Sequence, residues 1–178
     1  MGEKQIEEEV QRGDGFAPTL SVVIPVYQSA TTLPNLMNRL SEVLERHQIS
    51  HEFIFVEDGS PDNSWAVLQK LQEANPKNMT LIQLMRNFGQ HNALMCGFRY
   101  ARGQFVLTMD DDLQNPPEEI PKLLDAIRDG SYDVVYGASR QRKEHLYRRA
   151  GSYLVRRFCR FLLSLMSKSV RFVSFVAK

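Results

Sequence analysis

Apolar and polar residues alternate along the chain in two rhythms. Short runs rich in β-branched and aromatic residues have the length of buried strands, and they cover residues 20–26, 51–57, 79–85, 104–110 and 132–138. Between them, apolar residues recur at steps of three and four, which predicts amphipathic helices over residues 33–44, 65–71, 94–101 and 120–127. The repeated strand–helix–strand order indicates an α/β fold, a mostly parallel sheet flanked by helices on both faces.

Two of the helices have recognisable start sequences. Ser60 and Pro61 precede the second helix as a capping serine and a first-turn proline do. In the fourth helix, Asn115 is placed to cap, Pro116 to take the first position and Glu118 to complete a capping box. We therefore expect the fourth helix to begin at Pro116.

The composition is that of a single globular domain. The chain has 178 residues, 43% hydrophobic and 24% charged, which is enough for one substantial core. A formal net charge of +1 provides no general attraction for nucleic acid. Cys96 and Cys159 lack companions at metal-ligand spacing, so neither a zinc site nor a disulfide framework is indicated, and a reducing cytoplasm fits best. There is no signal region and no run of roughly 18 apolar residues, so we do not expect the chain to cross a bilayer.

We expect three regions along the chain, namely a flexible leader at 1–18, a folded domain at 19–142 and a basic C-terminal segment at 143–178. Residues 140–171 carry ten Arg or Lys side chains and one acidic residue, Glu144, which suggests an anionic partner. Residues 147–166 have an amphipathic pattern with arginines on the polar side. Such a helix can lie on an anionic membrane surface or pack on its own domain with the arginines outward.

Polar loops follow all five predicted strands, at 25–28, 57–64, 86–91, 110–117 and 137–142. Ligands of open α/β sheets bind beyond the carboxyl ends of the strands, so a site is expected where these loops meet. The chain lacks the glycine patterns of a P-loop and of a dinucleotide-binding turn, and it lacks a hydrolase nucleophile elbow. Those three kinds of site are therefore excluded.

The loop DDDLQNPP has the highest density of negative charge at this edge. If the chain is still extended there, Asp110, Asp112 and Gln114 point to the same side. Oxygen ligands at this spacing suit Mg²⁺ or Mn²⁺, which would neutralise the adjacent carboxylates. A calcium-binding EF-hand is excluded, because Asn115 and Pro121 stand where Gly and Glu are needed. The alternative is a solvated acidic turn before the positive end of a helix.

Two other loops carry candidate ligand groups. Glu57 and Asp58 end the second strand, where carboxylates can accept hydrogen bonds from a ribose or a base, and Gly59 permits a tight turn. Arg86 supplies a positive charge after the third strand. Its surroundings also fit an ordinary turn, and His91 could make only local hydrogen bonds.

The chain resembles the nucleotide-sugar-binding half of family 2 inverting glycosyltransferases, which have the Rossmann-like GT-A fold. The resemblance runs from about Leu20 to Arg149 and rests on five motifs in order, LSVVIPVYQ, VEDGSPDNS, RNFGQHNALMCGFRYARG, MDDDLQNPPEEIP and DVVYGASRQR. Within the family, RNFGQHNA and DLQNPPEEIP are most similar to the polyprenyl-phosphate sugar transferases. A single GT-A domain is therefore expected.

The resemblance, together with the loop chemistry, suggests a role for each matching position. The expected donor-nucleotide residues are Pro25, Tyr27, Glu57, Asp58, Arg86 and Asp111. The expected metal ligands are Asp110, Asp112 and Gln114, and the expected catalytic residues are Asp110, Asp112 and Arg140, of which Arg140 meets phosphate oxygens. Two positions depart from the family pattern. Glu57 replaces a common Asp, and Asp111 replaces a common Ala and adds a third negative charge.

The implied reaction uses Mg²⁺ or Mn²⁺ to neutralise the departing nucleoside diphosphate while an acceptor oxygen attacks the anomeric carbon with inversion. A lipid phosphate has a second pKa of about 6, so it is largely anionic at neutral pH and needs no strong base. The arginines expected to hold it are Arg142, Arg148 and Arg149. The implied partners are a nucleotide-sugar donor, a polyprenyl-phosphate acceptor, the membrane surface and a second copy of the chain, without nucleic acid. The expected location is the cytoplasm, at the inner face of the cytoplasmic membrane.

Two alternatives stay open at this point. Relatives of this kind continue beyond this length with membrane helices, and SVRFVSFVAK does not align with their acceptor motif. The chain would then be a truncated nucleotide-sugar-binding module without turnover of its own. A phosphorylated receiver-like domain would also use an acidic cluster, but it would need a lysine after a late strand.

Overall fold

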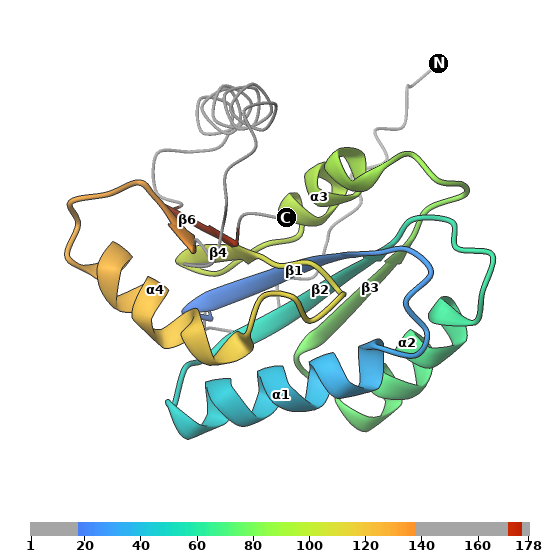
Figure 1. The fold of residues 1–178 in the computed structure, drawn as a ribbon, viewed down its shortest axis with the longest axis horizontal. Coiled ribbons are helices and arrows are strands. Elements are labelled where there is room, and N and C mark those ends of the chain that lie inside the picture. Colours follow the sequence, from blue (N-terminus) through green and yellow to red (C-terminus); the bar gives the residue numbers. More distant parts are fainter. Residues whose placement is uncertain (1–17, 138–170, 176–178) are drawn as a thin grey trace, which may run out of the picture.

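The structure is a computed structural model, and it describes residues 18–137 and 171–175. In this part of the chain six parallel strands form one sheet in the order β3-β2-β1-β4-β6-β5 (Figure 1). The strands are β1 (Leu20–Val26), β2 (His51–Glu57), β3 (Met79–Gln83), β4 (Phe105–Thr108), β5 (Val134–Gly137) and β6 (Arg171–Phe175). The α/β class and the parallel sheet predicted from the sequence are therefore confirmed.

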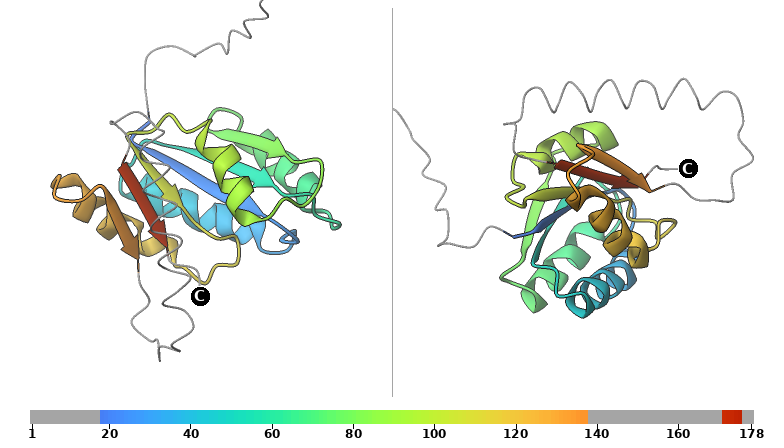
Figure 2. Two further views of the ribbon diagram at one scale, coloured as in Figure 1. Left: turned by 90° about the horizontal axis from the view of Figure 1, so that it is seen from above. Right: turned by 90° about the vertical axis from the view of Figure 1, so that its left-hand side faces the viewer.

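Helices cover both faces of this sheet (Figures 1 and 2). One face packs against α1 (Leu33–Arg46), α2 (Ser64–Ala74) and α4 (Ile120–Arg128), and the other against α3 (Gln90–Phe98). Side chains alternate along β1, so that Val22 and Ile24 belong to the first core and Val23 to the second. Because both faces are covered, every residue of β1 is buried, which explains why all of its residues except Ser21 are apolar.

Helix α3 approaches the sheet closely at Gly97. A Cβ atom at this position would lie 2.5 Å from Val23 Cγ1 and 3.1 Å from Val56 Cγ2. Ala93 on the same helix is fully buried in this second core. The close packing holds α3, which begins at Gln90, against this face of the sheet.

The expected start of the fourth helix is wrong. A short 3-10 turn, η1 (Pro117–Glu119), comes first, and α4 begins only at Ile120. Pro116 has an extended backbone with ψ of 125°, because a residue that precedes another proline is disfavoured in the helical conformation. Glu118 does not close a capping box, since its carboxylate accepts hydrogen bonds from Arg39 on α1.

The expected start of the second helix also shifts. Helix α2 begins at Ser64, and no side chain bonds to it from the Asn63 cap position. Asp62 accepts the Ser64 N–H at 3.1 Å, while the Ser60 hydroxyl accepts an N–H from another loop. Ser60 therefore connects two loops instead of capping the helix.

Strand β6 was not predicted from the sequence. It lies between β4 and β5, and its Val173 is in register with both Leu107 and Val135. The amphipathic segment at 147–166 lies outside the described residues. Within the described ranges, every helix is too short or too polar to span a lipid bilayer.

Candidate functional site

The loops after β1, β2 and β4 meet at the carboxyl edge of the sheet. β1 lies between β2 and β4, and all three strands run in the same direction. Backbone N–H groups of the loop after β1 donate to side chains of both neighbouring loops. The pairs are Gln28 with Ser60 Oγ at 3.0 Å, Ala30 with Asp62 Oδ2 at 3.2 Å and Tyr27 with Asp111 Oδ2 at 3.2 Å. The three loops therefore form one connected surface.

The acidic residues after β4 lie in a turn instead of an extended strand. β4 ends at Thr108, and Leu113 has a left-handed backbone with φ of 59°. Side chains alternate with a period of two only while the chain is extended. The expectation that an extended backbone aligns Asp110, Asp112 and Gln114 is therefore wrong, because the backbone is not extended over these residues.

Each aspartate of this turn has a different hydrogen-bond partner. The donors are Gln90 Nε2 for Asp110 at 2.6 Å, the Tyr27 N–H and the Ser29 hydroxyl for Asp111, and the Gln114 N–H for Asp112 at 2.9 Å. The first donor comes from α3, the second pair from the loop after β1, and the third from the turn itself. Asp111 is therefore directed toward the loop after β1.

The turn carries more negative charge than its surroundings favour. Burial raises the pKa of Asp110, and the neighbouring carboxylates of Asp112 and Asp111 raise it further, against the hydrogen bond from Gln90. Burial also raises the pKa of Asp111, although hydrogen bonds from Ser29 and Tyr27 oppose this shift. A bound cation would relieve the repulsion.

The chemistry of the turn fits a magnesium or manganese ion, provided that the donor supplies part of the coordination. Among the described residues, no group of three or more His, Cys, Asp or Glu side chains is arranged to hold a metal. Mg²⁺, however, is usually bound by one or two carboxylates plus waters and substrate phosphates. Asp110 and Asp112 are the two carboxylates of the turn that do not bond to the loop after β1.

The two carboxylates at the end of β2 are buried. Glu57 is 1% exposed and accepts the Ser60 N–H, while Asp58 is 3% exposed. Asp58 Oδ1 accepts the Phe88 N–H at 2.7 Å, and its Oδ2 accepts the Gly89 N–H at 2.8 Å. Both carboxylates therefore hold backbone in place at the edge of the site.

The other residues expected to bind the donor differ in accessibility. Pro25 is buried within β1, whereas the Tyr27 side chain beyond the end of the strand is 44% exposed. Arg86 is exposed in the loop after β3, and its guanidinium carbon lies 4.9 Å from the centre of the Phe88 ring. Gln114 is exposed as well.

Four expected residues cannot be placed in the site. Arg140, Arg142, Arg148 and Arg149 lie outside the described residues. The structure also brings in three residues that the sequence analysis did not assign to the site, namely Gln90, Ser29 and Ser60. Their position in polar loops after strands was the available signal, but their partners are residues far away in the sequence.

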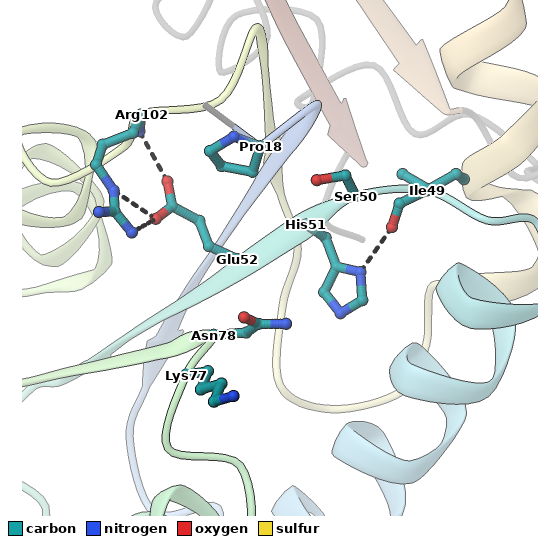
Figure 3. A pocket seen from close by; sticks show the side chains of 8 residues that line it. All are labelled: Pro18, Ile49, Ser50, His51, Glu52, Lys77, Asn78 and Arg102. Carbon is teal, nitrogen blue, oxygen red and sulfur yellow. Dashed lines mark hydrogen bonds and ion pairs between the residues drawn. The ribbon is translucent and has the colours of Figure 1, made fainter. Parts of the chain in front are cut away.

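A pocket of about 360 Å³ lies at the opposite, amino edge of the sheet (Figure 3). Its lining residues are Pro18, Ile49, Ser50, His51, Glu52, Lys77, Asn78 and Arg102. The buried Glu52 carboxylate accepts two hydrogen bonds from the Arg102 guanidinium, at 2.9 and 2.7 Å, and one from the Ser21 hydroxyl. These contacts join β1, β2 and the segment before β4, which gives the polar lining a structural role.

Comparison with known proteins identifies the family. Residues 21–175 match the model of glycosyl transferase family 2. The chain belongs to this family. The fold is accordingly of the GT-A type, which confirms the resemblance deduced from the motifs.

The chain is similar to a named transferase. It is 42% identical over 136 residues to the undecaprenyl-phosphate 4-deoxy-4-formamido-L-arabinose transferase of Proteus mirabilis (strain HI4320), an alignment that covers 76% of this chain and 41% of that protein. The chain thus spans about two fifths of this relative.

Two solved structures have the same fold. S. aureus TarS 1-349 in complex with UDP-GlcNAc has a TM-score of 0.54 and 24% identity, over 71% of this chain and 37% of that chain. The mannosyltransferase PcManGT from Pyrobaculum calidifontis in complex with GDP-Man and Mn²⁺ has a TM-score of 0.51 and 24% identity, over 58% and 30%.

Proposed function

We propose that this chain is a metal-dependent inverting glycosyltransferase. It transfers a sugar from a UDP-sugar to a polyprenyl phosphate at the inner face of the cytoplasmic membrane. The reaction belongs to the synthesis or modification of cell-envelope glycans. The observation that carries the proposal is the pair Asp110 and Asp112, two carboxylates whose mutual repulsion contributes to the raised pKa of Asp110, at the carboxyl edge of a GT-A sheet. The family supports the reaction type, and the name of the Proteus mirabilis relative supports the acceptor.

In this proposal Asp110 and Asp112 hold Mg²⁺ or Mn²⁺, with Gln114 as a further ligand. When bound, the cation supplies a Lewis acid that neutralises negative charge on the departing diphosphate. Gln90 donates to Asp110 Oδ1 and so keeps the other carboxylate oxygen available. The PcManGT structure, which contains Mn²⁺ and GDP-Man, supports a role for a metal in this fold.

The donor lies over the loops after β1 and β3. Tyr27 presents an exposed side chain to the nucleoside, and the buried Pro25 and Glu57 shape the backbone beneath it. Arg86 is exposed at the same edge and attracts the diphosphate. The solved complexes of this fold hold different nucleotides, UDP-GlcNAc in TarS and GDP-Man in PcManGT, so the choice of uridine rests on the resemblance.

On the acceptor side, the basic C-terminal third holds an anionic lipid phosphate. Arg140 contacts phosphate oxygens near the donor, and Arg142, Arg148 and Arg149 hold the acceptor. The amphipathic segment at 147–166 lies on the membrane surface.

The test of the metal role is Asp112→Asn. Asn retains the oxygen that accepts the Gln114 N–H but loses the negative charge. We expect calorimetry to show that Mn²⁺ no longer strengthens UDP binding, while the control Asp125→Asn, an exposed carboxylate on α4, binds like the unmodified chain. Unchanged Mn²⁺-dependent affinity in Asp112→Asn would disprove the metal role.

The alternative that the sequence leaves open is donor binding without turnover. Transfer of radiolabel from a UDP-sugar to undecaprenyl phosphate separates the two. Label in the lipid phase supports the transferase. Binding of UDP without label in the lipid supports a module that needs further sequence for catalysis.

A further inference from the structure

Both oxygens of the buried Asp58 carboxylate accept backbone N–H groups in this structure. Its side chain is 3% exposed, and each oxygen accepts one N–H, that of Phe88 at 2.7 Å and that of Gly89 at 2.8 Å. The two donors are consecutive residues of the loop that joins β3 to α3. A carboxylate that accepts from two adjacent N–H groups fixes both the position and the direction of that backbone.

The neighbouring Gly59 allows the loop after β2 and the loop after β3 to lie in direct contact. Gly59 has φ of +66°, and a Cβ atom there would be 2.4 Å from the backbone carbon of Arg86 and 2.6 Å from the Asn87 nitrogen. The loop after β2 therefore lies directly against the loop after β3. Gly89, with φ of +89°, then turns the chain into α3.

The fixed loop leads to the acidic turn. Gln90 follows Gly89 immediately, begins α3 and donates to Asp110 Oδ1 at 2.6 Å. Asp110 itself lies in a turn beyond the end of β4, outside any strand or helix. Its position therefore depends on Gln90, and the position of Gln90 depends on the backbone that Asp58 holds.

We propose that Asp58 is a positioning residue that fixes residues 88–90 and, through Gln90, the place of Asp110. This role is additional to the nucleoside contact that the family resemblance implies, because each carboxylate oxygen has a second lone pair that can accept a further hydrogen bond. The consequence for metal binding rests on the proposed function of Asp110.

The first test needs no ligand. In the full 178-residue chain, Asp58→Asn leaves one acceptor oxygen and places an NH₂ donor against the other N–H. Hydrogen exchange followed by NMR should show the Phe88 or the Gly89 amide exchanging at least about tenfold faster. The Gln90 side-chain amide resonances should move toward their positions in Asp110→Ala.

The matched control is Asp62→Asn, in the same loop. Asp62 also accepts backbone N–H groups, from Ala30 and Ser64, but it does not hold residues 88–90. This variant should leave the Phe88 and Gly89 amides protected. Unchanged protection in Asp58→Asn would overturn the proposal. If that variant does not fold, the unmodified chain decides, because exchange of both amides at the rate of an open loop would also overturn it.

The second test is a double-mutant cycle on Mn²⁺ affinity in the presence of UDP. At saturating UDP, Asp58→Asn and Gln90→Ala should each weaken Mn²⁺ binding about tenfold, and the double variant should weaken it no more than the more affected single variant does. Additive losses would show that Asp58 does not act through Gln90 and would overturn the proposal. A chain that binds neither UDP nor Mn²⁺ would refute the proposed function, while the exchange result would still decide the role of Asp58.

Discussion

The three consecutive aspartates that follow β4 differ in what they contact, although they are identical in the sequence. Asp110 receives a hydrogen bond from α3, Asp111 receives two from the loop after β1, and Asp112 receives one from its own turn. Of the three aspartates, Asp111 is the one that departs from the family pattern. Its contacts give it a structural function, to tie the loop that carries Tyr27 to the acidic turn.

Substitutions of Asp111 should separate its charge from its hydrogen bonds. Both donors, the Tyr27 N–H and the Ser29 hydroxyl, bond to Oδ2, so the single amide oxygen in Asp111→Asn can replace it. In Asp111→Ala both donors lose their acceptor. We expect Asp111→Ala to lower the free energy of unfolding by about 1–3 kcal/mol and Asp111→Asn to change it by less than about 0.5 kcal/mol.

Urea unfolding at neutral pH measures this difference. Because the pKa of Asp111 is raised by burial, its ionisation disfavours the folded state as pH rises, and Asp111→Asn removes that cost. If Asp111→Asn and Asp111→Ala unfold at the same urea concentration, the hydrogen bonds to the loop contribute nothing.

Among the elements, η1 and α1 are joined by one ion pair. The Arg39 guanidinium donates two hydrogen bonds to the Glu118 carboxylate, at 3.1 and 2.7 Å. The hydrogen bond from Arg39 lowers the pKa of Glu118, although partial burial opposes this shift. The pair holds η1, and with it the end of the acidic loop, against α1.

The lowered pKa predicts a specific acid sensitivity. Since Glu118 ionises more readily in the folded state than in the unfolded state, the pair stabilises the fold above the unfolded pKa of about 4.3, and the stabilisation is lost as pH falls through the lower folded value. The Glu118 side chain is 49% exposed, so the contribution is at most about 1 kcal/mol.

Unfolding by urea at about pH 6 and about pH 3.5 tests this prediction. Arg39→Gln should lower stability at the higher pH and have little effect at the lower one. Arg128→Gln, which removes the looser contact with Asp125 at 3.6 Å, should leave the pH dependence unchanged. An equal loss for Arg39→Gln at both pH values would show that the ion pair is not the cause.

The sequence predicted which helices and strands form better than it predicted where they begin and end. Within the residues that the structure describes, periodicity located the four α-helices and five of the six strands, because it reports burial of one face or of both. It placed the start of the fourth helix too early, since the proline at 117 disfavours a helical Pro116, whose backbone is extended. It also missed Arg171–Phe175, which is short and follows a long basic segment.

At the scale of the whole molecule, β6 connects two parts of the sheet. Val173 is fully buried and lies in register between Leu107 of β4 and Val135 of β5. Phe172 packs edge-to-face on Phe98 of α3, with ring centres 5.4 Å apart. Without this strand, β4 and β5 would have no neighbour on the sides that now face it.

Truncation of Val173 should therefore destabilise the whole domain. Val173→Ala removes two buried methyl groups from the main core and should cost about 2 kcal/mol. Val134→Ala, a half-buried residue of β5, is the matched control and should cost less. Urea midpoints give the comparison, and equal losses would indicate that β6 does not form part of the core.

The sequence by itself determined the α/β class, the parallel sheet and the edge where polar loops gather. Burial periodicity and the alternation of strands and helices along the chain are legible from the sequence alone. Its motifs also indicated the family that the comparison identified. Only the tertiary structure decided that β6 enters the sheet beside β4 and that Asp58 holds Gly89, 31 residues away. It likewise decided that Gln90 meets Asp110. These contacts join distant parts of the chain, and their geometry depends on how the helices pack on the sheet, which no local pattern encodes.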